Sequence, residues 1–270
     1  MTGTIGKSGS PGAKQELGAE LRSIADTLLS ARRDARALPA FPGQLPDTFE
    51  DAYAIQNYSR HAWPDEVGAW KVGGVPPGPY RERFGVDRLV GPVFSRAIHH
   101  VGEGEVAEFP VYPGSAAVEG EFVFQLGANP GEERMFIGVE LASSPVPAIN
   151  SLGPVAVICD FGNNGGLLVG QEIKNWRDID AGSIDLETLI DGEVVGTRTL
   201  TNFPKDALDA LAFLRAHAEK HSIDLPQDSL VTSGAITGVH ETRSGVSAVC
   251  RFGQFGEIQL KLVPAKPFAG

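Results

Sequence analysis

Cysteine is scarce in this sequence, and no long apolar run occurs. Of 270 residues only Cys159 and Cys250 are cysteines, each within an apolar stretch, and they form no CxxC pair. This spacing excludes a zinc ribbon or a dithiol redox motif and predicts two buried, reduced thiols. No segment approaches the roughly 20 apolar residues of a transmembrane helix. Residues 1–14 lack the apolar core of a signal peptide, so we expect a cytoplasmic protein without a membrane partner.

Basic residues are also in the minority. The chain has 23 lysines and arginines against 34 acidic residues, which gives a net charge of −11. Such a charge disfavours a phosphate backbone as a partner, so no nucleic-acid binding is expected, whereas binding of metal cations is compatible with it. Hydrophobic residues make up 42% of the chain, enough for a substantial core. The composition therefore indicates a soluble globular protein.

Hydrophobic periodicity divides the chain into a helical first part and a strand-rich remainder. Helical spacing predicts helices at 16–33, from Thr48 onward, and at 204–221. Alternation or short apolar runs predict strands at 67–72, 117–126, 135–141, 155–159, 246–252 and 257–263, and a hairpin that turns at Asp191-Gly192. We expect a flexible tail at 1–14, a helical N-terminal portion at 15–75 and a β-rich body at 76–270, integrated into one domain.

The pair Glu119 and Glu121 is the most informative feature that the chain does have. Val118, Phe122 and Phe124 alternate with period two, so both carboxylates are expected on one face of a strand. Two carboxylates this close raise each other's pKa unless a cation relieves their repulsion. Mg²⁺ or Mn²⁺ would relieve it, because these ions prefer oxygen ligands. The alternative is that the pair lies on the solvated face of an antiparallel strand.

Two further segments carry polar residues in an apolar or glycine-rich setting. Lys71 lies between Trp70 and Val72 in a predicted strand. A lysine there is either paired with an acid or an acid/base group whose pKa is lowered by burial. The segment 160–166 (Asp-Phe-Gly-Asn-Asn-Gly-Gly) follows an apolar run. Its glycines and its two asparagine amides indicate either the wall of a polar pocket or a long turn.

The order of several segments along the chain resembles the 2-keto-4-pentenoate hydratase branch of the fumarylacetoacetate hydrolase superfamily. The resemblance extends from about residue 17 to residue 263. It rests on segments 51–56 (DAYAIQ), 68–73 (GAWKVG), 84–87 (FGVD), 91–94 (GPVF), the Glu119-x-Glu121 pair, 160–170, 230–238 (LVTSGAITG) and 252–256 (FGQFG). It implies an α+β fold with a mixed β-roll or barrel-like body of the fumarylacetoacetase C-terminal type, a helical N-terminal portion, and assembly as a homo-oligomer.

The resemblance also implies a metal site. In the family the E-x-E motif supplies two ligands of a Mg²⁺ or Mn²⁺ ion, and a later strand supplies a third carboxylate. The matching positions here are Glu119, Glu121 and Glu140, the last within Phe136-Ile137-Gly138-Val139-Glu140-Leu141. Three acids on neighbouring strands would leave metal positions open for a small-molecule substrate, a 2-oxo or 2-hydroxydienoic acid.

Further site residues follow from the same resemblance. Lys71 matches the lysine of the family's G-x-K-x-G segment and is the candidate catalytic residue, for proton handling or for holding a carboxylate. Asn163 and Asn164 are candidate substrate-binding residues, and they stand where relatives usually carry small hydroxyl residues. Thr237, within the Ser-Gly-x-x-Thr-Gly stretch, is a candidate contact of the substrate carboxylate.

The implied reaction is hydration of a 2-hydroxyalka-2,4-dienoate to a 4-hydroxy-2-oxoalkanoate, a hydro-lyase step in the meta-cleavage catabolism of aromatic compounds. Alternatives within the superfamily are decarboxylation of a 2-oxo-3-enedioate and hydrolysis of an acylpyruvate C–C bond. The alternative from another class is a non-catalytic partner subunit. Retention of the three acids and of Lys71 favours an enzyme over that last alternative.

The chain departs from the family pattern in ways that bear on the reaction. Leu89 stands where close hydratases carry an aspartate, and the interval from Glu121 to Glu140 is shorter than usual. The hydrolase branch adds a His/Glu dyad on a lid helix. His99 and His100 are expected at a strand end instead, which disfavours the hydrolase.

Overall fold

The computed structural model describes residues 17–179 and 184–269, so the predicted tail at 1–14 lies outside the described residues. The helices are α1 (Ala19–Arg33), α2 (Phe49–Ala62), α3 (Pro79–Phe84), α4 (Pro154–Cys159) and α5 (Lys205–His221). The strands are β1 (Val67–Gly74), β2 (Arg88–Phe94), β3 (Ile98–His100), β4 (Val106–Val111), β5 (Ser115–Gln125), β6 (Arg134–Ser144), β7 (Asn164–Glu172), β8 (Ile184–Ile190), β9 (Glu193–Leu200), β10 (Leu230–Thr232), β11 (His240–Thr242), β12 (Ser247–Arg251) and β13 (Glu257–Pro264).

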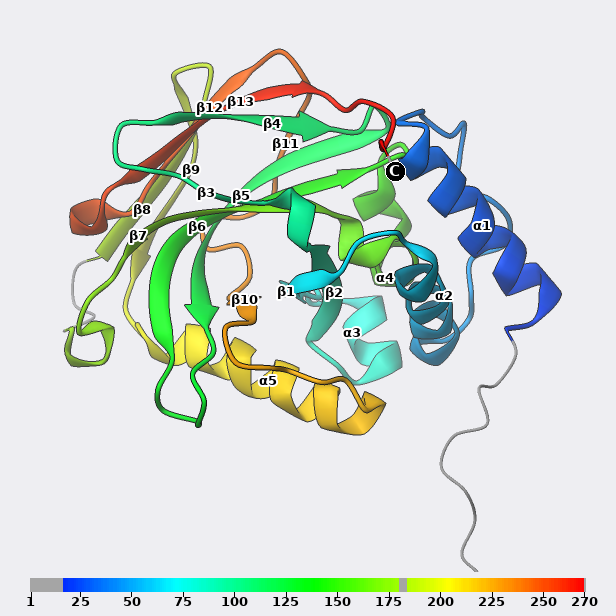
Figure 1. Ribbon diagram of the computed structural model, residues 1–270, viewed down its shortest axis with the longest axis horizontal. Helices are drawn as coiled ribbons and strands as arrows, with labels where there is room; N and C mark the ends of the chain where they lie inside the picture. Colours follow the sequence, from blue (N-terminus) through cyan, green and yellow to red (C-terminus); the bar gives the residue numbers. More distant parts are fainter. Residues whose placement is uncertain (1–16, 180–183, 270) are drawn as a thin grey trace, which may run out of the picture.

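Two sheets form the body. The larger has the order β2-β1-β10-β5-β6-β7-β3, with β11 paired to β5, and the smaller has the order β4-β13-β12-β8-β9. Most pairs are antiparallel, but β1–β10, β3–β7 and β4–β13 are parallel. Figure 1 shows β5 and β6 curving around the body, so the larger sheet is a curled half-barrel. The mixed, barrel-like α+β fold implied by the resemblance is confirmed.

Apolar side chains on both sides of β5 explain this layering. Val118, Phe122 and Phe124 belong to the large core that includes residues of the smaller sheet and of α5. Val123, on the alternate face, packs with apolar residues of β1, β2 and β7. A separate core joins α1, α2 and α4, the helices drawn at the right of Figure 1.

Most predicted elements agree with the structure, and their ends have local causes. The second helix begins after Thr48, whose Oγ1 accepts a hydrogen bond of 3.0 Å from the Asp51 amide. The hairpin between β8 and β9 turns at Asp191 and Gly192, with φ of 49° and 84°, as a type I′ turn requires. Strand β1 pairs within the larger sheet although it follows the N-terminal helices directly.

The predicted strand at 155–159 is wrong, because these residues form helix α4. Pro154 at the first helical position favours a helix start, and the five-residue apolar run after it fits either state. Contact with α2 on the buried side decides for the helix. In the described part of the chain, no helix is long and apolar enough to cross a membrane.

Candidate metal centre and its cavity

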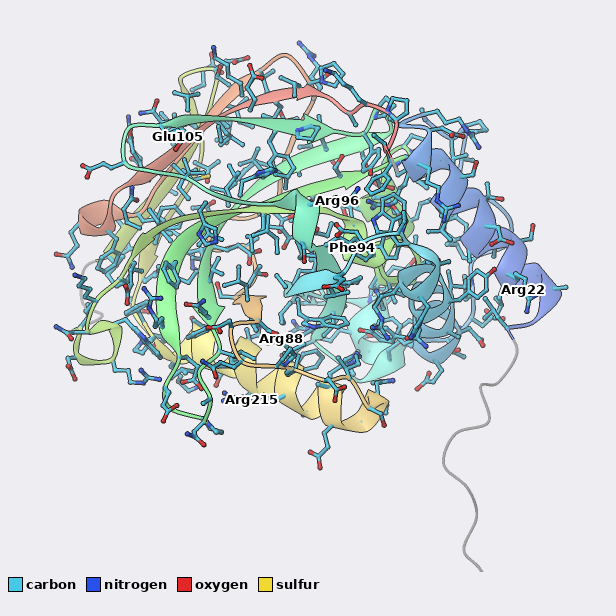
Figure 2. All side chains as sticks on the ribbon, viewed as in Figure 1. Arg22, Arg88, Phe94, Arg96, Glu105 and Arg215 are labelled. Atoms are coloured by element: carbon cyan, nitrogen blue, oxygen red, sulfur yellow. The ribbon has the colours of Figure 1, made fainter. Side chains whose placement is uncertain are left out.

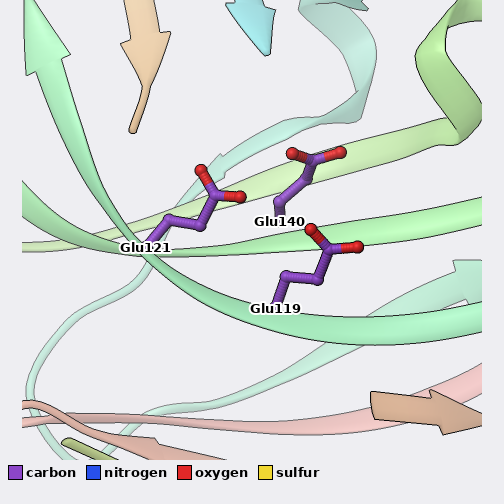
Figure 3. A group of neighbouring side chains, drawn as sticks. All are labelled: Glu119, Glu121 and Glu140. Atoms are coloured by element: carbon purple, nitrogen blue, oxygen red, sulfur yellow. The ribbon is translucent and has the colours of Figure 1, made fainter. Parts of the chain in front are cut away.

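Glu119, Glu121 and Glu140 meet on one face of the β5–β6 hairpin. Glu119 stands directly opposite Glu140 in the antiparallel ladder, and Glu121 follows two residues later on the same face. Figure 3 shows the three carboxylates turned toward a common point from two neighbouring strands. One carboxylate oxygen of each lies within 4.8 Å of the others. Glu121 and Glu140 are fully buried and Glu119 is 5% exposed, so the alternative of a solvated strand face is wrong.

Three neighbours hold these carboxylates in place. Lys71 Nζ lies 2.7 Å from Glu140 Oε1, and Asn164 Nδ2 donates to the same oxygen at 3.0 Å. The backbone amide of Gly234 donates to Glu121 Oε2 at 2.8 Å. The lysine comes from β1, the asparagine from the start of β7, and the glycine from the loop after β10. The site is therefore assembled from three regions of the chain around one hairpin.

The donor set fits a hard divalent ion. Glu121 Oε1 and Glu140 Oε2 are buried and find no hydrogen-bond donor within the described residues. A buried carboxylate oxygen without a donor costs free energy unless a cation faces it. Octahedral Mg²⁺, with bonds of about 2.1 Å, needs oxygens about 3 to 4 Å apart, and the observed separations allow this. The three acids can therefore hold Mg²⁺ or Mn²⁺.

Burial and mutual repulsion raise the pKa values of Glu119 and Glu121 in the metal-free protein. Burial raises the pKa of Glu119 to about 7, because the repulsion by Glu140 adds to burial and the nearby Lys71 compensates only in part. Burial, followed by repulsion from Glu140 and Glu119, holds the pKa of Glu121 well above its ordinary value. The repulsion between carboxylates that the sequence indicated contributes to both shifts, but burial, which the sequence did not indicate, is the larger cause.

Lys71 is a paired cation. Burial alone would lower the pKa of this lysine, but the charges of Glu140, Glu119 and Glu121, with the hydrogen bond to Glu140, together raise it above the ordinary value. Of the two alternatives for Lys71, the ion pair is therefore confirmed, and a pKa lowered by burial is wrong for the metal-free protein. Its ammonium is charged and lies on the wall of a cavity.

The cavity has a volume of about 880 Å³ and is also lined by Glu119. This volume lies in the range of small-ligand sites. Apolar side chains form part of its wall, among them Leu89, Val157 and Phe203. Leu89, at the position of the aspartate of close hydratases, is buried and places an apolar group beside the β1 backbone near Lys71.

The segment 160–164 has a backbone that few side chains tolerate. Phe161, Gly162 and Asn163 have φ of 57°, 68° and 60°, three consecutive left-handed residues. Such strain concentrates at functional sites. Gly91 permits it, because a Cβ there would collide with the Phe161 carbonyl. Gly162 and Asn163 line the cavity, and Asn164 turns away from it to Glu140.

Asn163 and Thr237 have different surroundings. Asn163 Nδ2 donates to Asn150 Oδ1 at 3.2 Å, while its own Oδ1 is buried and has no partner in the described chain. This amide oxygen is available to a ligand. The Thr237 hydroxyl instead lies 2.8 Å from Thr188 Oγ1 and 3.1 Å from His240 Nε2, and Thr237 is not among the residues lining the cavity. A substrate contact of Thr237 stays a prediction.

Sequence reasoning missed a second buried ion pair next to the acids. Arg32 of α1 binds Asp160 through Nε at 2.6 Å and Nη2 at 2.9 Å, and its Nη1 donates to the Asn164 carbonyl at 2.9 Å. The arginine thus ties the N-terminal helix to the segment that carries Asn163 and Asn164. Its spacing of four and three residues from Leu28 and Leu29, on the apolar face of α1, is the signal that could have revealed it.

Comparison with solved structures finds proteins of similar fold. 4-Oxalocrotonate decarboxylase from Pseudomonas putida G7, complexed with magnesium and adipate, is 18% identical, and the match covers 90% of this chain and 97% of that chain with a TM-score of 0.69. Its complex with calcium and acetate matches equally well. The chain has the fold of 4-oxalocrotonate decarboxylase.

A second solved structure is similar over less of the chain. Fumarylpyruvate hydrolase from Pseudomonas aeruginosa, in complex with Mn²⁺ and pyruvate, is 16% identical, with a TM-score of 0.52 over 75% of this chain and 91% of that chain. No protein-family model and no curated protein sequence matches the chain. The likeness is thus one of fold, and the chemistry has to be argued from the site.

Proposed function

We propose that the protein is a metal-dependent enzyme of 2-oxo acids that hydrates a 2-hydroxyalka-2,4-dienoate to a 4-hydroxy-2-oxoalkanoate. The observation that carries this proposal is the buried triad of Glu119, Glu121 and Glu140 beside Lys71 at a cavity wall. Three acids with two oxygens lacking donors are a poor structural element and a good metal site. The fold shared with 4-oxalocrotonate decarboxylase complexed with magnesium and with fumarylpyruvate hydrolase in complex with Mn²⁺ and pyruvate supports the metal-dependent part of the proposal.

Glu119, Glu121 and Glu140 would hold the ion. When bound, Mg²⁺ or Mn²⁺ supplies a Lewis acid that stabilises negative charge developing on the carboxylate and 2-oxo oxygens of a substrate. Asn164 fixes the orientation of Glu140 through its hydrogen bond. Such a second hydrogen-bonded layer around the ligands tunes metal affinity.

Lys71 is assigned the proton handling. Its ammonium reaches the cavity and can hold a substrate carboxylate or give a proton to carbon. In the reaction, the 2-hydroxyl proton leaves and a proton is added at C5, which gives a 2-oxo-3-ene. The hydroxyl of water then bonds to C4 while a proton is added at C3, so the elements of one water are gained. Leu89 offers no second acid or base in place of the family's aspartate.

Decarboxylation of a 2-oxo-3-enedioate is the second candidate. The observation in its favour is the match to 4-oxalocrotonate decarboxylase over 97% of that chain. Loss of CO₂ from such a substrate leaves an electron pair that its own conjugated 2-oxo group accepts. Glu119, Glu121 and Glu140 would hold the ion that stabilises this negative charge, so the same acids serve either reaction. The two candidates differ in whether the product has gained water or lost CO₂.

The hydrolase and the non-catalytic subunit have less support. His99 and His100 of β3 are exposed, and neither is among the residues that line the cavity, so they offer no water-activating dyad there. In a subunit without metal, the buried triad beside Lys71 would be an unfavourable element, because two of its carboxylate oxygens have no hydrogen-bond donor in the described residues.

The metal site is tested by isothermal titration of Mg²⁺ and Mn²⁺ into chelator-treated protein. Glu119→Gln, Glu121→Gln and Glu140→Gln keep side-chain shape and remove one charge each, and we expect each to lose measurable metal binding while remaining folded. Glu241→Gln is the matched control, because Glu241 lines the cavity outside the triad. Wild-type affinity in all three triad variants would overturn the proposal.

The reaction is tested by ultraviolet monitoring of the Mg²⁺- or Mn²⁺-loaded protein with 2-hydroxydienoates, 2-oxo-enedioates and acylpyruvates. Mass analysis of the products distinguishes water gained from CO₂ lost. Turnover of the first class alone supports the hydratase, and turnover of the second class alone replaces it with the decarboxylase. The homo-oligomer expected from the resemblance is tested separately by light scattering over a wide concentration range.

A further inference from the structure

Two histidines on one face of α5 form a second group of metal-ligating side chains, outside the cavity. His217 and His221 are four residues apart near the end of the helix, so their side chains lie one turn apart on the same face. Neither is among the residues that line the cavity. In Figures 1 and 2, α5 runs along the lower side of the molecule, and Arg215, labelled in Figure 2, precedes His217 by two residues.

The two imidazole rings are close enough to share one ion. Their centroids are 4.3 Å apart and their planes are inclined at 30°. Two nitrogens bound to the same Zn²⁺ by bonds of about 2.0–2.1 Å lie about 3 Å apart, a separation that rings at this distance can present. A spacing of four residues is also that of paired zinc-ligating histidines on helices. Ala218 follows His217 where the metalloprotease motif has its glutamate base, so the spacing indicates metal binding without that hydrolysis.

The ring nitrogens of this pair are not used by the fold. In the described part of the chain, the histidine rings that form side-chain hydrogen bonds are those of His61 and His240. Burial, with smaller contributions from the charges of His221 and Lys220, lowers the pKa of His217 to about 4, and burial also lowers the pKa of His221. Both imidazoles are therefore neutral at pH 7, which is the form that binds a metal.

Helix α2 packs against the pair and brings an acid to it. The Tyr53 ring centroid lies 4.7 Å from that of His217 and 5.5 Å from that of His221, and the Val90 amide donates to the Tyr53 hydroxyl at 3.0 Å. Glu50, one turn before Tyr53 on α2, is exposed, and its charge acts to raise the pKa of His221. Among the described residues, no three ligand atoms there lie within 4.8 Å of one another, so Glu50 joins the rings only after its side chain rotates.

We propose that His217 and His221 bind a Zn²⁺ ion, with Glu50 as a third ligand and water completing the coordination shell. Neutral imidazoles suit Zn²⁺, whereas carboxylates suit Mg²⁺ and Mn²⁺, so this site and the triad select different ions. A net charge of −11 favours the approach of a cation. The ion would join α5 to α2 at a distance from the cavity, and this inference is independent of the proposed function.

The test is isothermal titration of Zn²⁺ into full-length Glu121→Gln protein, whose triad lacks one acid, in excess Mg²⁺. We expect one Zn²⁺ to bind per chain. His217→Asn and His221→Asn, each added to that protein, leave a single imidazole and should weaken Zn²⁺ binding about ten-fold or more, because two ligands on one helix act as a chelate. His99→Asn and His100→Asn are the matched controls. These exposed neighbours on β3 point to opposite faces and cannot share an ion, so the affinity should stay the same.

A second measurement identifies the ligand atoms. With one equivalent of Cu²⁺ in place of Zn²⁺, electron paramagnetic resonance should show coupling to two imidazole nitrogens, and each histidine variant should lose one. A copper spectrum without nitrogen coupling overturns the proposal and needs no variant to fold.

The titration gives two further ways to contradict the site. Absence of Zn²⁺ binding, or full affinity retained in both folded histidine variants, overturns the proposal, and thermal melting shows that the variants are folded. Glu50→Gln should weaken Zn²⁺ binding less than either histidine variant does, because Glu50 reaches the ion only by rotation. Unchanged affinity in Glu50→Gln overturns the third ligand.

Discussion

Arg32 and Lys71 are both buried cations paired with acids, yet their surroundings differ in one respect. Arg32 donates five hydrogen bonds, to Asp160, Ser143 and Asn164, and both Asp160 carboxylate oxygens have donors. Lys71 faces three acids, of which Glu121 and Glu140 each keep one oxygen without a donor in the described residues. A single residue, Asn164, links the two groups, since its carbonyl accepts from Arg32 and its amide donates to Glu140.

The difference separates a structural ion pair from a functional one. A buried ion pair whose hydrogen bonds are complete gains no stability from a further ligand. Removal of one partner of the pair leaves the other charge buried and unpaired. A buried cluster with excess negative charge and free oxygens is stabilised when a cation binds. Incomplete hydrogen bonding together with excess negative charge, rather than burial, is therefore the property that distinguishes the candidate metal cluster from the Arg32–Asp160 pair.

The largest effect is expected on stability from Arg32→Met. This change leaves Asp160 charged and unpaired in the interior, so the free energy of unfolding should fall by about 3–5 kcal/mol in urea denaturation. Arg33→Met is the matched control, because Arg33 is exposed and donates only to the Ala62 carbonyl. A loss below about 1 kcal/mol for Arg32→Met would contradict the structural role.

The next effect is expected on turnover from Lys71→Ala. With the metal site saturated, kcat/KM should fall by about 100-fold or more, the scale of a positioned acid/base group. Lys71→Arg should restore little if a proton is transferred, because arginine keeps its proton, and more if charge alone is needed. If Lys71 only neutralises Glu140, the alanine variant should lose thermal stability or metal affinity and keep nearly full turnover at saturating Mg²⁺.

A smaller effect is expected at the link between the two groups. Asn164→Ala removes the donor to Glu140 and should weaken Mg²⁺ binding by about 10- to 100-fold in calorimetry. Asn163→Ala is the control for this measurement, because its amide lines the cavity without a hydrogen bond to the acids. Equal metal affinity of wild type and Asn164→Ala would show that the two groups act independently.

The smallest effect, and one of opposite sign to Arg32→Met, is expected from Glu121→Gln in metal-free protein. The amide keeps an oxygen for the Gly234 amide and removes one buried like charge. The free energy of unfolding should therefore stay the same or rise by about 1 kcal/mol, the order of one screened charge pair. Urea denaturation in chelator measures it, and a loss comparable to that of Arg32→Met would erase the distinction between the clusters.

The sequence allowed the strand and the paired acids to be predicted because their signal is local. Period two around Glu119 and Glu121 defines a strand face without knowledge of any partner strand. Whether that face meets water or the interior depends on elements far along the chain, so burial could not be derived, and Glu140 was matched only by resemblance. At 155–159 the local signal itself is ambiguous, because a short apolar run fits either a helix or a strand.

Of the cations in and around the site, Lys71 could be identified from the sequence and the arginines could not. Lys71 was recognised because a charge between two apolar strand neighbours is unusual. Arg88 begins β2 and Arg198 lies within the exposed strand β9, positions where arginines are ordinary, and only the folded structure shows that both line the cavity. The place of Arg32 on the apolar face of α1 indicates its burial, but its partner Asp160 lies 128 positions away, and no local pattern identifies that partner.

The β5–β6 hairpin carries all three acids within 30 residues, from Ser115 to Ser144, whereas most of the cavity wall comes from other elements, and only Glu119 and Phe122 of the hairpin line it. This layout allows the two properties to be changed separately. A library of variants confined to wall positions outside the hairpin alters the shape and charge of the cavity and leaves unchanged the three acids that can hold a divalent ion.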